Sequence, residues 1–169
     1  MKRLELFHFQ ITSKVVVDMK LKSIAVELFS ILTKDEELLE LMEVPKTYSK
    51  GKDIYLMKDL KKQFLEERNP GDLVDTDFTR LCVYELPATR SRFSILERAY
   101  IQVDIYVTKR KNIRDRRTLM IADRLRALLH NSKIFDYEIT YFNRSPDSEA
   151  QNAEWTKYGI TFCYSNIII

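Results

Sequence analysis

Apolar residues recur at intervals of three and four in the first third of the chain, which is the spacing of one face of an α-helix. The residues that share this face are Leu21, Ile24, Ala25, Leu28, Ile31 and Leu32. Asp18 is the expected N-cap of that helix. A second, short helix is expected after a break near Thr33, because Thr33 and Glu36 have the spacing of a capping box, and Pro45 ends it.

Another helical pattern runs from Ile113 to His130. Asn112 is its expected N-cap, and Asn131 follows it as a stop. Its apolar face consists of Ile121, Ala122, Leu125, Leu128 and Leu129. The sequence therefore predicts one long amphipathic helix in the second half of the chain.

Polar and apolar residues alternate on both sides of this helix, which is the period of a half-buried β-strand. The clearest strand runs from Tyr100 to Thr108, with an apolar set of Ile101, Val103, Ile105 and Val107. Shorter strand patterns lie at 81–86, 135–141 and 158–164, and the polar loop NRSPDSEAQNA separates the last two. One covered face and one wetter face favour antiparallel pairing.

The order of these patterns predicts an α+β fold, with a mainly antiparallel four- to five-stranded sheet and two to three helices packed on one face. We expect residues 1–169 to form a single domain. A densely charged excursion interrupts the pattern at about 46–80. We predict one helix there, from an apolar stripe that Asn69-Pro70-Gly71 ends, and the stripe consists of Tyr55, Leu56, Leu60, Phe64 and Leu65.

Composition places the chain among soluble globular proteins, since 45% of its residues are hydrophobic and 31% are charged. Its net charge of +3 is lower than a dedicated nucleic-acid-binding protein usually has. We expect no membrane span and no signal peptide, because no long uninterrupted apolar segment occurs and the N-terminal segment contains charges. Cys82 and Cys163 lack metal-ligand spacing, so we expect small buried hydrophobes in a reducing cytoplasm.

A basic cluster follows the strand that ends at Thr108, and its six members are Lys109, Arg110, Lys111, Arg114, Arg116 and Arg117. They are the candidate partner-binding residues. One interpretation is a solvated connection, although arginines at the start of a helix oppose its dipole. A second is complementary charge at a protein interface, where arginine is enriched. A third is phosphate contact in a small nucleic-acid-binding module, although no aromatic stacking residues are interleaved.

No group of residues has the spacing of a catalytic site. His8 and His130 lack a nucleophile or acid at a suggestive spacing. Asp104, Glu138 and Lys109 weakly suggest a metal-dependent nuclease, but the strand VDIYVTK lacks an acid and a lysine two residues apart. The alternative is that both acids lie on the solvated faces of their strands. We therefore expect no enzymatic activity, no metal and no cofactor.

Several segments together resemble a known family. These are LFSILTKDEELLELM, LCVYELP, the strand YIQVDIYVTKR running into IADRLRALLH, and the last strand KYGITFCYS. The layout is similar to the tail terminator, or tail completion, proteins of long-tailed phages and prophages, which join head and tail as the lambda tail terminator does. The unit at 100–130 provides most of the match, which covers about 15–45 and 80–165.

The resemblance implies a non-enzymatic structural protein that forms a ring, commonly of six copies. It implies self-association as a homo-oligomer, contact with the tail tube protein and the head connector or stopper protein, and genomic DNA passing through the lumen. It places the protein at the head–tail joint of the virion, and in the host cytoplasm during assembly. The excursion at 46–80 departs from the family pattern, and its partner is not implied.

Overall fold

The computed structural model describes residues 24–49, 52–71, 73, 77–90, 96–134, 137–149 and 153–167. Within these ranges the helices are α1 (Ile24–Leu32), α2 (Glu36–Leu41), α3 (Met57–Gln63), α4 (Lys109–Asp115) and α5 (Arg117–Leu129). The strands of the same ranges are β1 (Lys46–Ser49), β2 (Lys52–Tyr55), β3 (Phe64–Leu65), β4 (Arg80–Arg90), β5 (Leu96–Thr108), β6 (Ser132–Ile134), β7 (Tyr137–Glu149) and β8 (Trp155–Ile167).

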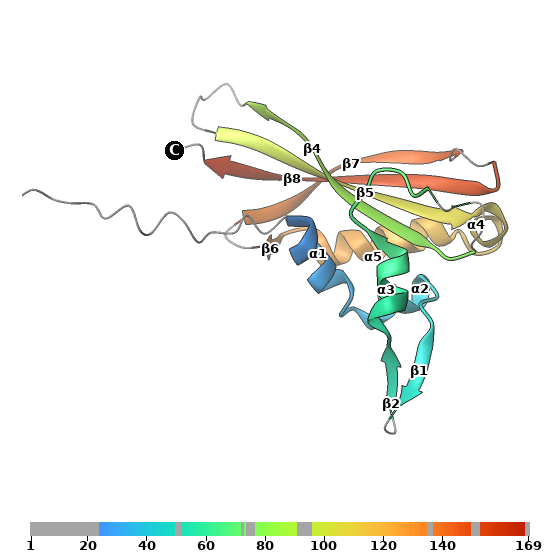
Figure 1. Cartoon of the computed structure of the whole chain (residues 1–169). Helices are drawn as coiled ribbons and strands as arrows, with labels where there is room; N and C mark the ends of the chain where they lie inside the picture. The colour runs from blue at the N-terminus through green and yellow to red at the C-terminus, as the bar shows by residue number, and fades with distance from the viewer. Residues whose placement is uncertain are drawn as a thin grey trace, which may run out of the picture.

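One six-stranded sheet organises the chain, in the order β3-β4-β5-β8-β7-β6 (Figure 1). All neighbouring strands are antiparallel except β3 and β4, which are parallel. The central pair, β5 and β8, is in register from Leu96 opposite Ile167 to Thr108 opposite Trp155. The predicted α+β class with a mainly antiparallel sheet is therefore confirmed, and the sheet is one strand wider than expected.

The helix-facing side of the sheet holds the main core. The alternating residues Ile101, Val103, Ile105 and Val107 of β5 are all buried there, as the period of two predicts. Helix α5 covers this face with the buried residues Ile121, Ala122, Leu125 and Leu129. Full burial of each large aliphatic side chain contributes roughly 1.5–3 kcal/mol, so this layer dominates the packing energy.

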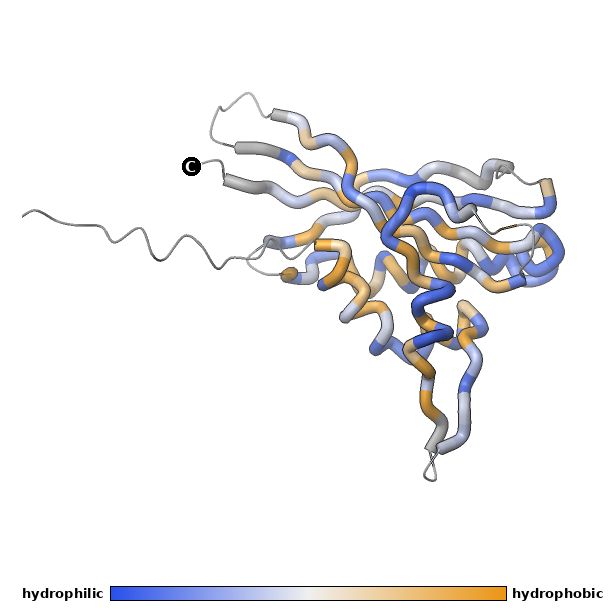
Figure 2. Tube along the Cα trace, viewed as in Figure 1, coloured by the Kyte–Doolittle hydropathy of each residue, from blue (hydrophilic) through white to orange (hydrophobic). Residues whose placement is uncertain are grey.

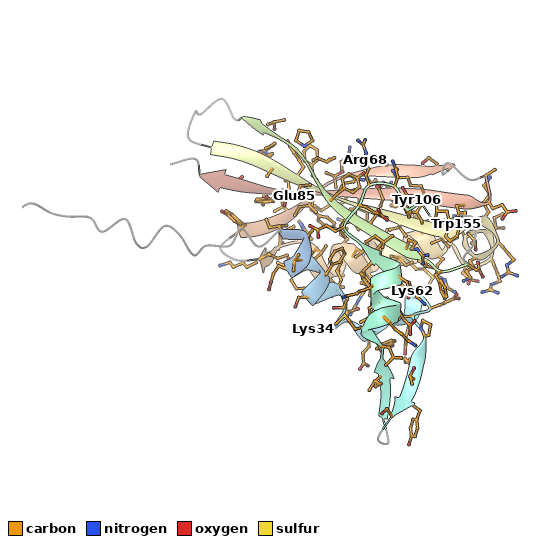
Figure 3. The ribbon with its side chains drawn as sticks, in the orientation of Figure 1. Lys34, Lys62, Arg68, Glu85, Tyr106 and Trp155 are labelled. Carbon is orange, nitrogen blue, oxygen red and sulfur yellow. The ribbon has the colours of Figure 1, made fainter. Side chains whose placement is uncertain are left out.

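The opposite face carries a smaller core under the segment that leads from β3 to β4. Its buried members are Leu73, Cys82, Tyr106 and Trp155. The Trp155 indole Nε1–H donates to the Leu73 carbonyl at 2.7 Å, and the Tyr106 hydroxyl donates to the Arg68 carbonyl at 3.3 Å. Figure 3 shows Tyr106 and Trp155 where this segment crosses the sheet. The segment between β3 and β4, held by these long-range hydrogen bonds, thus covers a sheet face that the sequence pattern predicted to be solvent-exposed.

Helices α1 and α2 meet at the predicted break. The N-cap of α2 is Asp35, whose carboxylate accepts from the Leu38 N–H at 2.8 Å. The capping box predicted at Thr33 and Glu36 is therefore wrong, and the Thr33 hydroxyl instead donates to the Phe29 carbonyl. Asp35 is a better acceptor at that position because it is a carboxylate at the positive end of the helix. The predicted N-cap Asp18 lies outside the described residues.

The charged excursion contains the helix predicted there and a hairpin that was not predicted. Helix α3 occupies Met57–Gln63 and buries Leu60 in the main core. Before it, β1 and β2 pair as an antiparallel hairpin, with Lys46 opposite Tyr55. Figure 1 shows this hairpin projecting away from the sheet.

Strands β7 and β8 are longer than predicted. The segment NRSPDSE belongs to β7, although we predicted a polar loop there. Register shifts between Tyr141 and Asn143 and between Ser145 and Ser148 let polar residues stay in the ladder with β8. Phe135 and the terminal Ile168 and Ile169 lie outside the described residues.

Candidate interaction surface

The basic cluster forms helix α4 and the junction between α4 and α5. We predicted one helix from Ile113 to His130, and this is wrong because the chain turns at Arg116, where φ is 50°. Helix α4 begins after Thr108 instead, and no side chain caps it. Asn112 still acts as a cap, but for α5: its Oδ1 accepts from the Thr118 N–H at 3.0 Å and from the Thr118 hydroxyl at 2.7 Å.

Two of the six basic residues point inward and hold other segments in place. The Lys111 Nζ lies 2.6 Å from a Glu43 carboxylate oxygen and donates to the Asp77 carbonyl at 2.9 Å. Arg117 contacts the other Glu43 oxygen at 3.1 Å and donates to the Leu41 carbonyl at 3.0 Å. The hydrogen bond from Lys111 lowers the pKa of Glu43 and outweighs partial burial, which acts to raise it. Both cations are therefore structural.

The outward part of the cluster consists of Arg110, Arg114 and Arg116. The Arg114 guanidinium contacts the neighbouring Asp115 carboxylate at 2.7 and 2.8 Å. Arg114 and then Arg117 hold the pKa of Asp115 well below its usual range. Arg110 lies 3.4 Å from the Asp77 carboxylate, which Lys111 also contacts at 3.4 Å. Lys109 is half-buried on the same helix. The six residues thus share one region, but they do not form a uniform basic patch.

Asp104 sits in a buried polar network, so the prediction that it lies on a solvated strand face is wrong. Its side chain is fully buried beside Lys157, with the Lys157 Nζ 2.7 Å from Oδ2. The Tyr84 hydroxyl and the Gln102 amide each donate to it at 2.8 Å. Burial and then the hydrogen bond to Asp104 raise the pKa of Tyr84. Three donors therefore surround the carboxylate, which is the arrangement of a structural ion pair.

The three residues of the nuclease pattern are not brought together. Glu138 is exposed on β7, two residues before Thr140, and Thr140 pairs with Cys163 of β8. Asp104 pairs with Gly159, which lies four residues before Cys163 on the same strand. At about 3.3 Å a residue, roughly 20 Å of strand separates the two carboxylates. Lys109 lies beyond the end of β5.

The remaining candidates for chemistry have local structural roles. The His130 Nδ1 accepts from the Tyr141 N–H at 3.1 Å and so joins the end of α5 to β7. Burial raises the pKa of the Cys82 thiol to about 12. His8 lies outside the described residues. Over the described ranges, no three His, Cys, Asp or Glu side chains are placed to hold a metal ion, and no helix is long and apolar enough to cross a bilayer.

A cavity of about 300 Å³ opens beside the inward part of the cluster, between α2 and α5. Its apolar lining is Leu41 and Met120, and its charged lining is Glu37, Glu40, Asp115 and Arg117. Met120 is 47% exposed and its neighbour Leu119 is 37% exposed. A smaller cavity of about 200 Å³ is lined by Lys111 together with Glu43, Asp77 and Phe78 among others.

Large apolar side chains are also exposed on several elements, one of which, the β1–β2 hairpin, was not predicted from the sequence. These exposed residues include Tyr48 and Ile54 of the hairpin, Ile113 of α4 and Phe142 of β7. Figure 2 shows hydrophobic residues on the β2 side of the hairpin, outside the main body. The available signal was the segment KTYSKGKDIY, in which a lysine- and glycine-containing turn separates two short strands.

Comparison with known proteins places this geometry in context. A family model described as YomW matches residues 35–165. No curated protein matches the chain. Among solved structures, the chain is similar to a protein of the structure titled "Virion of native gene transfer agent (GTA) particle", with a TM-score of 0.48 and 10% identity, over 85% of this chain and 97% of that one.

Proposed function

The chain belongs to the YomW family, and we propose that it is a structural protein of a phage or prophage particle that assembles into a ring at the head–tail joint. In this role it ends the tail tube and joins it to the head connector. The observation that supports the proposal is the unit at 100–130, in which β5 runs into α4 and α5 and packs its apolar face under α5. This unit, in its order of elements, resembles the tail terminator proteins.

The surface of the described residues supports assembly rather than catalysis. Exposed apolar side chains occur on separate elements, including Tyr48 on the hairpin, Met120 on α5 and Phe142 on β7. Apolar groups exposed together in one contiguous patch mark protein–protein contacts, whereas single exposed ones are common on any protein surface. A closed ring of identical subunits needs two different complementary patches on each copy, and separate elements provide them. The proposed partners are further copies of this chain, the tail tube protein and the head connector protein, with genomic DNA in the lumen of the virion joint.

The nucleic-acid-binding alternative is weakened by the internal use of the basic cluster. Lys111 and Arg117 are 14% exposed and share Glu43, and Arg114 is paired with Asp115. Counterion release on DNA requires cations that are free to contact phosphates. We therefore assign the outward residues Arg110 and Arg116 to the charged rim of an interface.

Light scattering over a range of protein concentrations, combined with electron microscopy of purified tail tubes incubated with the protein, tests the proposal. We expect a defined oligomer and added density at one end of the tubes. A protein that stays monomeric at every concentration and never binds tubes contradicts it. Salt-dependent DNA binding that is lost in the Arg110→Ala, Arg114→Ala, Arg116→Ala triple variant would instead favour the nucleic-acid-binding module.

A further inference from the structure

We draw no further inference here: the strongest candidate, the partly exposed patch that Leu86, Tyr100, Cys163 and Phe142 form on the sheet face opposite α5, carries no proposal because nothing in the residues that the structure describes shows what covers it.

Discussion

At the scale of single residues, the outer face of the central strands shows how a buried polar group fixes its neighbours. Asp104 accepts from Tyr84 and Gln102 and contacts Lys157, while the Thr161 hydroxyl donates to Gln102 at 2.6 Å. The alternation along β5 predicts which face Asp104 is on. It does not predict that Asp104 is buried, because its cover comes from a segment about 40 residues earlier in the chain, through contacts such as Tyr106 with Arg68.

The first prediction concerns Gly159, which lies opposite Asp104 on β8. A Cβ atom there would lie 2.5 Å from the Gln102 Nε2 and 3.0 Å from the Asp104 Oδ1. We expect Gly159→Ala to cost about 1–3 kcal/mol in the free energy of unfolding, because Gln102 has to give up its hydrogen bond to a buried carboxylate. Urea denaturation measures this loss.

Gly71 provides the matched control for that substitution. Nothing lies within 4 Å of a Cβ atom added there. Gly71→Ala should therefore leave the free energy of unfolding unchanged, or raise it by a few tenths to about 1 kcal/mol through lower entropy of the unfolded chain. Equal losses at both positions would show that the close approach at Gly159 is not the cause.

At the scale of elements, the sequence predicts the existence of helices and strands better than their ends. The helix at 113–130 was predicted from an apolar face that starts at Ile121. The pattern therefore does not indicate where a helix over residues 109–116 begins or ends. The turn at Arg116 lacks the glycine or asparagine that usually marks a left-handed residue. Its support comes from Asn112, six residues before the Thr118 groups that it caps.

The positive φ of Arg116 leads to a second prediction. A residue with a Cβ atom costs roughly 1 kcal/mol in the left-handed region, and glycine does not. We expect Arg116→Gly to raise the free energy of unfolding by about 0.5 kcal/mol after the greater entropy loss of glycine is included. Arg116→Val should lower it, because a β-branched residue is strained at φ 50°. Thermal or urea unfolding that ranks valine above glycine would contradict the geometry.

The contact between α2 and α5 leads to a third prediction, about pH. The Arg124 guanidinium contacts Asp35 at 2.6 and 2.9 Å, and this hydrogen bond is the main reason that the pKa of Asp35 lies below its ordinary value of 3.8. A carboxyl whose folded pKa is lowered stabilises the fold above its unfolded pKa, and this contribution is lost as the pH falls through the folded pKa. Asp35→Asn should therefore destabilise the protein at pH 7 and have less effect below about pH 4.

Asp35→Ala separates the cap from the charge. Asparagine still accepts from the Leu38 N–H, whereas alanine does not. The alanine variant should lose about 1 kcal/mol more than the asparagine variant, at neutral and acidic pH alike. An asparagine variant that is no more stable than the alanine variant would show that the cap depends on the charge of Asp35.

At the scale of the whole molecule, the segment from 46 to 80 is where prediction from sequence was weakest. The existence of its helix is confirmed by α3, but the helix ends at Gln63, and Phe64 and Leu65 of the predicted stripe form β3 instead. The hairpin before it has strands of four residues, too short for a clear alternation. The way the excursion joins the body could not be predicted, since it depends on ion pairs between distant residues, such as Lys111 with Glu43 and Asp77.

The ion pairs to Glu43 and Asp77 also divide the basic cluster into two classes. In the sequence every lysine and arginine has the same charge, and only the fold shows which of these charges are paired within the chain. Lys111 is 14% exposed and contacts both Glu43 and Asp77, whereas Arg110 is 83% exposed and contacts only Asp77 among the carboxylates of the described residues. We expect Lys111→Met to lower the free energy of unfolding by about 1 kcal/mol, the upper range for a partly exposed ion pair. Arg110→Met should leave it unchanged and instead weaken association with a partner, more strongly at low salt. Urea denaturation and sedimentation velocity, run on both variants, measure the two effects, and a Lys111 variant as stable as wild type would mean that the excursion is held to the body by other contacts.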